Sequence, residues 1–172
     1  CYPTTVVSKL TYMTGAVLFL VFNRPEHTRR SLNAVLRNSP TRLYISGDGP
    51  RSSHPNDVSN IEQVWRVIKE AGITCPTYTK RFESNSGCRL AVSSALDWFF
   101  ENEEEGLVIE DDVLLAPGAG TLVRQMLEFG REHKQLGSVS AFNGTPKRFQ
   151  SDSTRTFRGS IYSSSQAWGT WR

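Results

Sequence analysis

Residues 17–22, VLFLVF, form a continuous apolar run, and Asn23-Arg24-Pro25 follows it directly. A run of this length is typical of a central strand that is covered on both faces of a sheet. Proline is favoured in the first turn of a helix, where its missing N–H costs no hydrogen bond. We therefore predict a buried strand that leads straight into a helix.

The same alternation of strand and helix continues along the chain. Apolar or β-branched runs predict further strands at 42–46, 77–82, 107–109 and 138–142. Apolar residues at helical spacing predict a helix after each of the first four strands. Gly106 is expected to end the third helix, and the fourth is expected from about Gly118 to His133. This alternation indicates a three-layer α/β sandwich with a mostly parallel central sheet and right-handed crossovers.

Composition limits the class of protein. The chain has 172 residues, 38% of them hydrophobic, which favours one domain with a real core over a disordered chain. No stretch approaches the roughly 20 apolar residues that span a bilayer, and a net charge of +3 is too small to indicate nucleic acid by itself. Cys1, Cys75 and Cys88 have no CxxC spacing, which argues against a disulfide framework or a structural zinc site. The sequence also lacks the GxxxxGK[ST], GxGxxG and GxSxG patterns of ATPases, dehydrogenases and serine hydrolases.

Polar residues gather where the predicted strands end. Arg24 follows the first strand, Asp48 the second, Asn85 and Gly87 the third, and residues 110–112 the fourth. Open α/β sheets bind ligands at the carboxyl ends of their strands. These side chains are therefore expected to line one ligand-binding edge.

Glu110-Asp111-Asp112 places three adjacent carboxylates directly after a buried strand. Adjacent carboxylates repel one another unless a positive charge lies among them, and oxygen ligands suit Mg²⁺ or Mn²⁺. Because alternate side chains of a strand share a face, Glu110 and Asp112 are expected to point one way and Asp111 the other. The alternative is that Asp111 or Asp112 only caps the next segment, but a cap needs a single acid. Three acids favour a metal site.

From about residue 17 onward, the chain resembles the GT-A-fold glycosyltransferases, whose sandwich is Rossmann-like. VIEDDVLLAP at 108–117 is similar to the EDD version of the metal-binding DxD motif of N-acetylglucosaminyltransferase I-like enzymes and related bacterial sugar transferases. LFLVFNRP at 18–25 is similar to their first strand and arginine turn, and SGDG at 46–49 to their second-strand acid. SVSAFN at 138–143 is similar to the strand after the metal motif, and WGTW at 168–171 to the Gly-Trp segment of the acceptor side.

The resemblance implies a metal-dependent, inverting transfer of a sugar from a nucleotide-diphosphate sugar, a UDP-sugar, to a hydroxyl of a glycan or other acceptor. Arg24 would contact the diphosphate or base, and Asp48 would hydrogen-bond the base. Glu110 and Asp111 would approach the ribose and sugar, and Asp112 would ligate Mn²⁺ or Mg²⁺. Simpler alternatives remain: Asp48 only shapes its turn, and Arg24 is a surface charge.

The resemblance also implies boundaries. Residues 1–172 would form a single nucleotide-sugar-binding domain, with an N-terminal extension at 1–15. Residues 143–172 would begin an acceptor-side region that is incomplete. Because the sequence stops at Trp171-Arg172 inside an aromatic cluster, we expect a chain truncated at its C-terminus.

An inverting enzyme needs a general base for the acceptor hydroxyl. The family places a carboxylate shortly before the Gly-Trp segment, yet residues 159–166, GSIYSSSQ, contain no acid, and Asp152 is the nearest one. Three alternatives remain open: Asp152 is the base, the base lies beyond residue 172, or this chain is inactive.

Two other functions stay open. The missing base favours a non-catalytic module that binds a nucleotide-sugar or a glycan. A nucleotidyltransferase would carry a glycine-rich basic loop after the first strand, where Asn23-Arg24-Pro25 stands instead. Without a recognisable signal peptide or membrane span, we expect a cytoplasmic protein, peripheral to the membrane at most, in polysaccharide biosynthesis. A lost N-terminal anchor would reverse that expectation.

Overall fold

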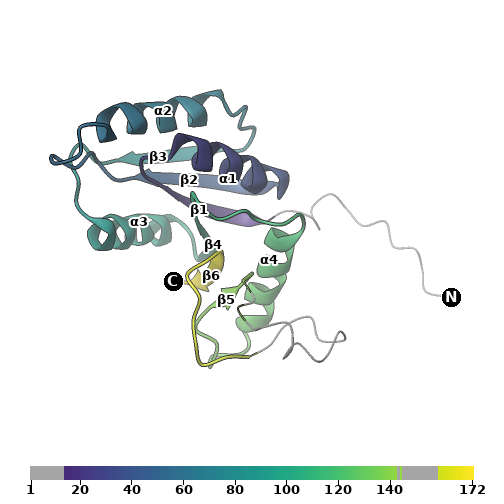
Figure 1. Cartoon of the computed structure of the whole chain (residues 1–172). Helices are drawn as coiled ribbons and strands as arrows, with labels where there is room; N and C mark the ends of the chain where they lie inside the picture. Colours follow the sequence, from purple (N-terminus) through teal and green to yellow (C-terminus); the bar gives the residue numbers. More distant parts are fainter. Residues whose placement is uncertain (1–13, 143, 145–158) are drawn as a thin grey trace.

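The computed structural model describes residues 14–142, 144 and 159–172, in which four helices pack on a six-stranded sheet (Figure 1). The strands are β1 (Gly15–Val21), β2 (Pro40–Gly47), β3 (Thr77–Arg81), β4 (Glu105–Glu110), β5 (Val139–Ser140) and β6 (Trp168–Trp171). The helices are α1 (Pro25–Arg37), α2 (Asp57–Glu70), α3 (Cys88–Asn102) and α4 (Ala119–Gly130). The predicted α/β class and mostly parallel sheet are confirmed, and the arrangement is compatible with a Rossmann-like fold.

The order of the strands across the sheet is β3-β2-β1-β4-β6-β5. Strands β3, β2, β1 and β4 run parallel, and β6 runs antiparallel between β4 and β5. The chain moves outward from β1 to β3 and then returns to β4 on the other side of β1. Such a reversal leaves a crevice at the carboxyl ends of the two central strands, where open α/β sheets bind ligands. Here β1 and β4 flank that switch point.

Strand β1 shows why the helices cover both faces of the sheet. Its side chains alternate: Val17 and Phe19 pack into the cluster that contains residues of α1, α2 and α4, whereas Ala16 and Leu18 pack into the cluster around α3. All four side chains are buried. Figure 1 accordingly shows α1 and α2 on one side of the sheet and α3 on the other.

Helix α3 differs from the sequence prediction. It ends at Asn102, and Gly106 lies inside β4 rather than at the helix end. A Cβ on Gly106 would lie 2.4 Å from the ring of Phe99, so the glycine serves close packing of the helix on the strand. Only Ala95 and Phe99 of α3 are buried, and Leu90 is 61% exposed.

Strand β6 is a second difference. The segment WGTW, for which no strand was predicted, lies between β4 and β5 and pairs antiparallel with both. Gly169 lets it approach α4, because a Cβ there would lie 2.8 Å from the Val123 side chain. The predicted strand at 138–142 is reduced to β5, Val139–Ser140. In the described parts of the chain, none of the helices has the length and apolar character needed to cross a bilayer.

Candidate functional site

The three carboxylates predicted as a metal site stand at the end of β4. The backbone N–H of Val113 donates to the Glu110 carbonyl at 3.2 Å, which closes a tight turn after the strand. Strand alternation therefore holds only as far as Glu110, and the turn sets the directions of the next two side chains. Asp111 is buried, while Glu110 and Asp112 are exposed.

Asp111 joins the ends of β4 and β1. Its Oδ2 accepts hydrogen bonds from the backbone N–H of Phe22 at 3.3 Å and from the hydroxyl of Thr28 at 3.2 Å. Burial raises the pKa of this carboxyl, and the two hydrogen bonds oppose that rise. Through these contacts, Asp111 anchors the loop that follows β4 to the end of β1 and to the first turn of α1.

Asp112 faces Arg24 across the switch point between β1 and β4. The Arg24 Nη1 lies 3.0 Å from the Asp112 Oδ2, and both side chains are about half exposed, at 55% and 45%. Partial loss of hydration, followed by the charges of Asp112 and Asp111, raises the pKa of Glu110, whereas the charge of Arg24 lowers it. Arg24 therefore acts electrostatically on the whole carboxylate triplet.

The structure brings together three of the predicted site residues, Asp48, Asn85 and Gly87. Asn85 and Gly87 both donate hydrogen bonds to the Asp48 carboxylate. The Asp48 Oδ1 accepts the N–H groups of Gly49 at 2.9 Å and Ser86 at 2.8 Å. Its Oδ2 accepts the Asn85 amide at 2.9 Å and the N–H of Gly87 at 3.1 Å. A carboxylate offers about four lone-pair sites, so these donors fill its capacity. This is the geometry of the simpler alternative, in which Asp48 fixes the loop that precedes α3.

Sequence reasoning missed a second group at this edge, around Asp57. This buried side chain accepts hydrogen bonds from the Asn23 amide at 2.7 Å, from Nε and Nη2 of Arg51 at 2.7 and 2.9 Å, and from the Arg51 backbone N–H at 3.1 Å. The Arg51 guanidinium holds the pKa of Asp57 well below its usual range. The guanidinium also lies over the ring of Phe22, 5.1 Å from its centroid. Asn23 follows β1 directly, and this position was the available signal.

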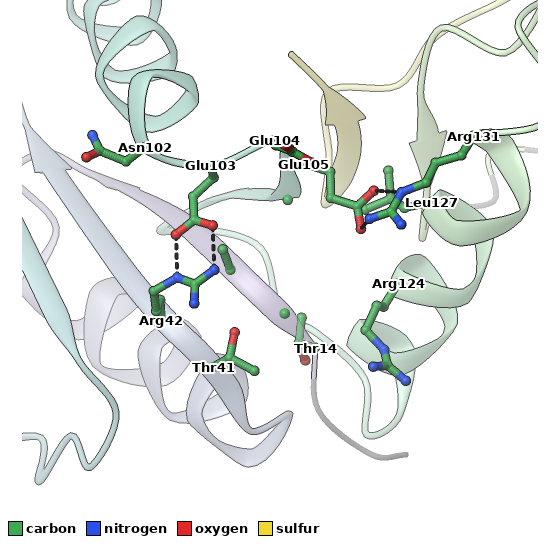
Figure 2. A pocket seen from close by; sticks show the side chains of 13 residues that line it. Thr14, Thr41, Arg42, Asn102, Glu103, Glu104, Glu105, Arg124, Leu127 and Arg131 are labelled. Atoms are coloured by element: carbon green, nitrogen blue, oxygen red, sulfur yellow. Dashed lines mark hydrogen bonds and ion pairs between the residues drawn. The ribbon is translucent and has the colours of Figure 1, made fainter. Parts of the chain in front are cut away.

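A cavity lies at the opposite edge of the sheet, where the parallel strands begin (Figure 2). It measures about 400 Å³, and its walls carry arginines and glutamates that mostly pair with one another. Glu103 holds the guanidinium of Arg42 in a two-pronged ion pair, and Glu105 holds Arg131 at 2.8 Å. Arg124 lines the wall formed by α4, and its buried Nε has no hydrogen-bond partner among the described residues. The charges of this cavity thus serve mainly the packing of its own walls.

The donor set for a metal at the carboxyl edge is small. Among the described residues, no three His, Cys, Asp or Glu side chains are grouped so that they could hold a metal ion by themselves. Asp112 and Glu110 are the exposed acids of the triplet, because Asp111 is engaged with β1 and α1. One or two carboxylates fit Mg²⁺ or Mn²⁺ when the other ligands are water and phosphate oxygens, as in nucleotide enzymes.

None of the protein-family models matches the chain, and no curated protein matches it.

Proposed function

We propose that this chain is the nucleotide-sugar-binding domain of a metal-dependent glycosyltransferase of the GT-A type. It would transfer a sugar, with inversion, from a UDP-sugar to a hydroxyl of a glycan or another acceptor. The observation that carries the proposal is the position of Arg24, Glu110 and Asp112 at the switch point of the sheet. A cation and two exposed carboxylates at that place suit a diphosphate together with a divalent metal.

Each residue has a role in this proposal. Asp112, with Glu110 beside it, would hold Mn²⁺ or Mg²⁺, and Arg24 would bind the diphosphate through its planar fork of donors. The bound metal would neutralise the diphosphate as it leaves the sugar. Asp111 would position the turn through its bonds to Phe22 and Thr28.

Asp48 enters the proposal with a changed role. Its carboxylate is already filled by four donors of the chain. We therefore assign it to holding the loop 84–87 beside the nucleotide, in place of a direct bond to the base. The Asp57 group would do the same for the loop that follows β2.

The general base stays a prediction. Asp152 lies outside the described residues, and the described residues 159–166 contain no acid. The proposed compartment is the cytoplasm, including the membrane periphery.

The test of transfer is release of UDP from a panel of UDP-sugars with Mn²⁺, with and without simple hydroxyl acceptors. The matched pair of variants is Asp112→Asn, in the site, and Asp97→Asn, an exposed acid of α3 outside it. The proposal predicts release by the native chain and by Asp97→Asn, and none by Asp112→Asn. Equal release by all three proteins would contradict it.

A non-catalytic binding module is the second candidate. The observation that favours it is the acid-free segment 159–166 that leads into β6. Such a module would bind UDP with Mn²⁺ but release no UDP from any UDP-sugar under the same conditions. Binding without turnover would therefore select the second candidate over the first.

A further inference from the structure

The contact between Arg24 and Asp112 affects how a metal and a nucleotide would bind to the proposed site. Within the described residues, Asp112 has one ion-pair partner, the guanidinium of Arg24. A metal that binds to Asp112 must therefore displace this cation or share the carboxylate with it. In the structure, Arg24 supplies the positive charge that lowers the repulsion among the three carboxylates, which a bound metal would otherwise do.

The backbone of Arg24 is fixed, while its side chain is held by this exposed contact. Its carbonyl accepts hydrogen bonds from the backbone N–H and the hydroxyl of Thr28, both at 2.9 Å, and Pro25 begins α1 directly after it. The side chain is 55% exposed, and ion pairs of that exposure are weak, at about 0.2–1 kcal/mol. The guanidinium can therefore leave Asp112 at little cost without any movement of the backbone.

A metal alone gains little at this place, and the loss of the Arg24 contact, although small, offsets part of that gain. The protein offers it one or two carboxylates, and no larger group of ligands exists among the described residues. A diphosphate changes both sides of this balance. It adds oxygen ligands to the metal, and it offers the displaced guanidinium a new two-pronged partner.

From this geometry we propose that Arg24 couples metal binding to diphosphate binding by exchanging one partner for the other. Without nucleotide, Arg24 holds Asp112 and competes with the metal. With nucleotide, Arg24 moves to the diphosphate and releases Asp112 to the metal. This inference rests on the proposed function, and it adds that metal and nucleotide bind with positive, reciprocal coupling.

The test is titration of Mn²⁺, followed by the EPR signal of the free ion, without UDP and with saturating UDP. The proteins are the native chain, Arg24→Gln, Arg24→Lys and Arg29→Gln. Arg29 is a matched control because it lies on α1 in an exposed contact with Glu26, outside the site. It reports how much the loss of any nearby positive charge strengthens Mn²⁺ binding.

We expect Arg24→Gln to bind Mn²⁺ alone about two- to five-fold more tightly than Arg29→Gln does, the range that corresponds to a weak surface ion pair. The gain in Mn²⁺ affinity caused by UDP should be smaller in Arg24→Gln than in the native chain. Arg24→Lys should bind Mn²⁺ alone like the native chain, since the charge stays, but should show a reduced effect of UDP, since lysine lacks the planar fork.

Two results would overturn the inference, and they differ in what they say about the proposed function. If UDP and Mn²⁺ bind together but Arg24→Gln behaves like Arg29→Gln, the exchange is wrong and the proposed function stands. If the native chain binds UDP under no condition, the proposed function fails and the exchange fails with it.

Discussion

The two edges of the parallel strands differ in how their charges are used. At the amino edge, where these strands begin, most of the arginines and glutamates pair with each other. At the carboxyl edge, where they end, two exposed carboxylates lie beside an arginine that is held by one exposed ion pair. At the amino edge, Glu103 is 7% exposed and fully engaged by Arg42 and the hydroxyl of Tyr44. At the carboxyl edge, Asp112 is 45% exposed and forms an ion pair with Arg24, which is itself 55% exposed. A cavity of about 400 Å³ lies at the amino edge. A charged ligand there would have to compete with existing ion pairs, so a cavity does not by itself locate the binding site in this molecule.

The comparison predicts that a charge removed at the amino edge lowers stability and leaves ligand binding unchanged. Glu103→Ala should reduce the free energy of unfolding by about 2–3 kcal/mol, because Arg42 and Tyr44 lose a buried acceptor. Urea unfolding measures the loss, and Glu104→Ala, an exposed neighbour, is the control. The affinity of the folded variant for UDP with Mn²⁺ should equal that of the native chain. A parallel loss of affinity would remove the proposed division between the edges.

Asp57→Asn is expected to lower the free energy of unfolding by about 2 kcal/mol, slightly less than Glu103→Ala, because hydrogen bonds to a buried charge are lost. Its pKa is lower in the folded chain than in the unfolded chain. The stability it contributes is therefore present above the ordinary carboxyl pKa and is lost as the pH falls below it. As the pH is lowered from 7 to 3, the free energy of unfolding should fall more steeply for the native chain than for Asp57→Asn. Equal slopes for the two proteins would show that the carboxylate is not held by Arg51.

Asp48→Asn should lower the free energy of unfolding by about 1–2 kcal/mol. The new amide group would turn an N–H donor toward backbone N–H groups that donate hydrogen bonds to the carboxylate in the native chain. The variant also decides between two roles. If Asp48 holds the loop before α3, then UDP, CDP and GDP lose affinity by the same factor. A loss confined to UDP would instead support a direct bond to the base.

The smallest effect on stability is expected at Arg24. Arg24→Gln should change the free energy of unfolding by less than about 1 kcal/mol, because its ion pair is exposed. The same variant should weaken UDP binding in the presence of Mn²⁺. Thermal unfolding and calorimetry on one preparation separate the two quantities. A large loss of stability would place Arg24 with the structural charges of the amino edge.

The sequence predicted the sheet well where the strands are long and apolar. The run at 17–22 and the short run at 107–109 became β1 and β4, because alternate side chains of both strands are buried on opposite faces. Strand β6 was missed, since four residues containing a glycine carry little pattern of their own, and their pairing with β4 is antiparallel. Gly106 was misread because the sequence does not show that Phe99 packs against that position.

The carboxyl edge was predictable as a place but not in its contacts. The rule that polar residues follow parallel strands located Arg24, Asp48 and the carboxylate triplet. It could not show that Asp48 is filled by the loop before α3, or that Asp111 is buried against β1. Those outcomes depend on which loops approach each other. A Cβ on Gly49 would lie 2.4 Å from the backbone of Ser84, a close approach that residue types alone do not reveal.

The amino edge was not predicted at all. The pair between Arg42 and Glu103 joins residues 61 positions apart, across β2 and the segment that follows α3. The segment 101–112 contains seven acids that are close together in the sequence. In the structure, Glu103 and Glu105 lie where β4 begins, while Glu110, Asp111 and Asp112 lie where it ends.

The most direct test of the account is calorimetric titration of UDP into the native chain and into Asp112→Ala, with Mn²⁺ and with EDTA. Asp97→Ala is the control for the loss of one exposed acid. We predict binding by the native chain and by Asp97→Ala with Mn²⁺, a loss of it in EDTA, and an affinity lower by about 10- to 100-fold or more in Asp112→Ala. Binding that is the same in EDTA, or unchanged in Asp112→Ala, would contradict a metal-assisted nucleotide site at the carboxyl edge.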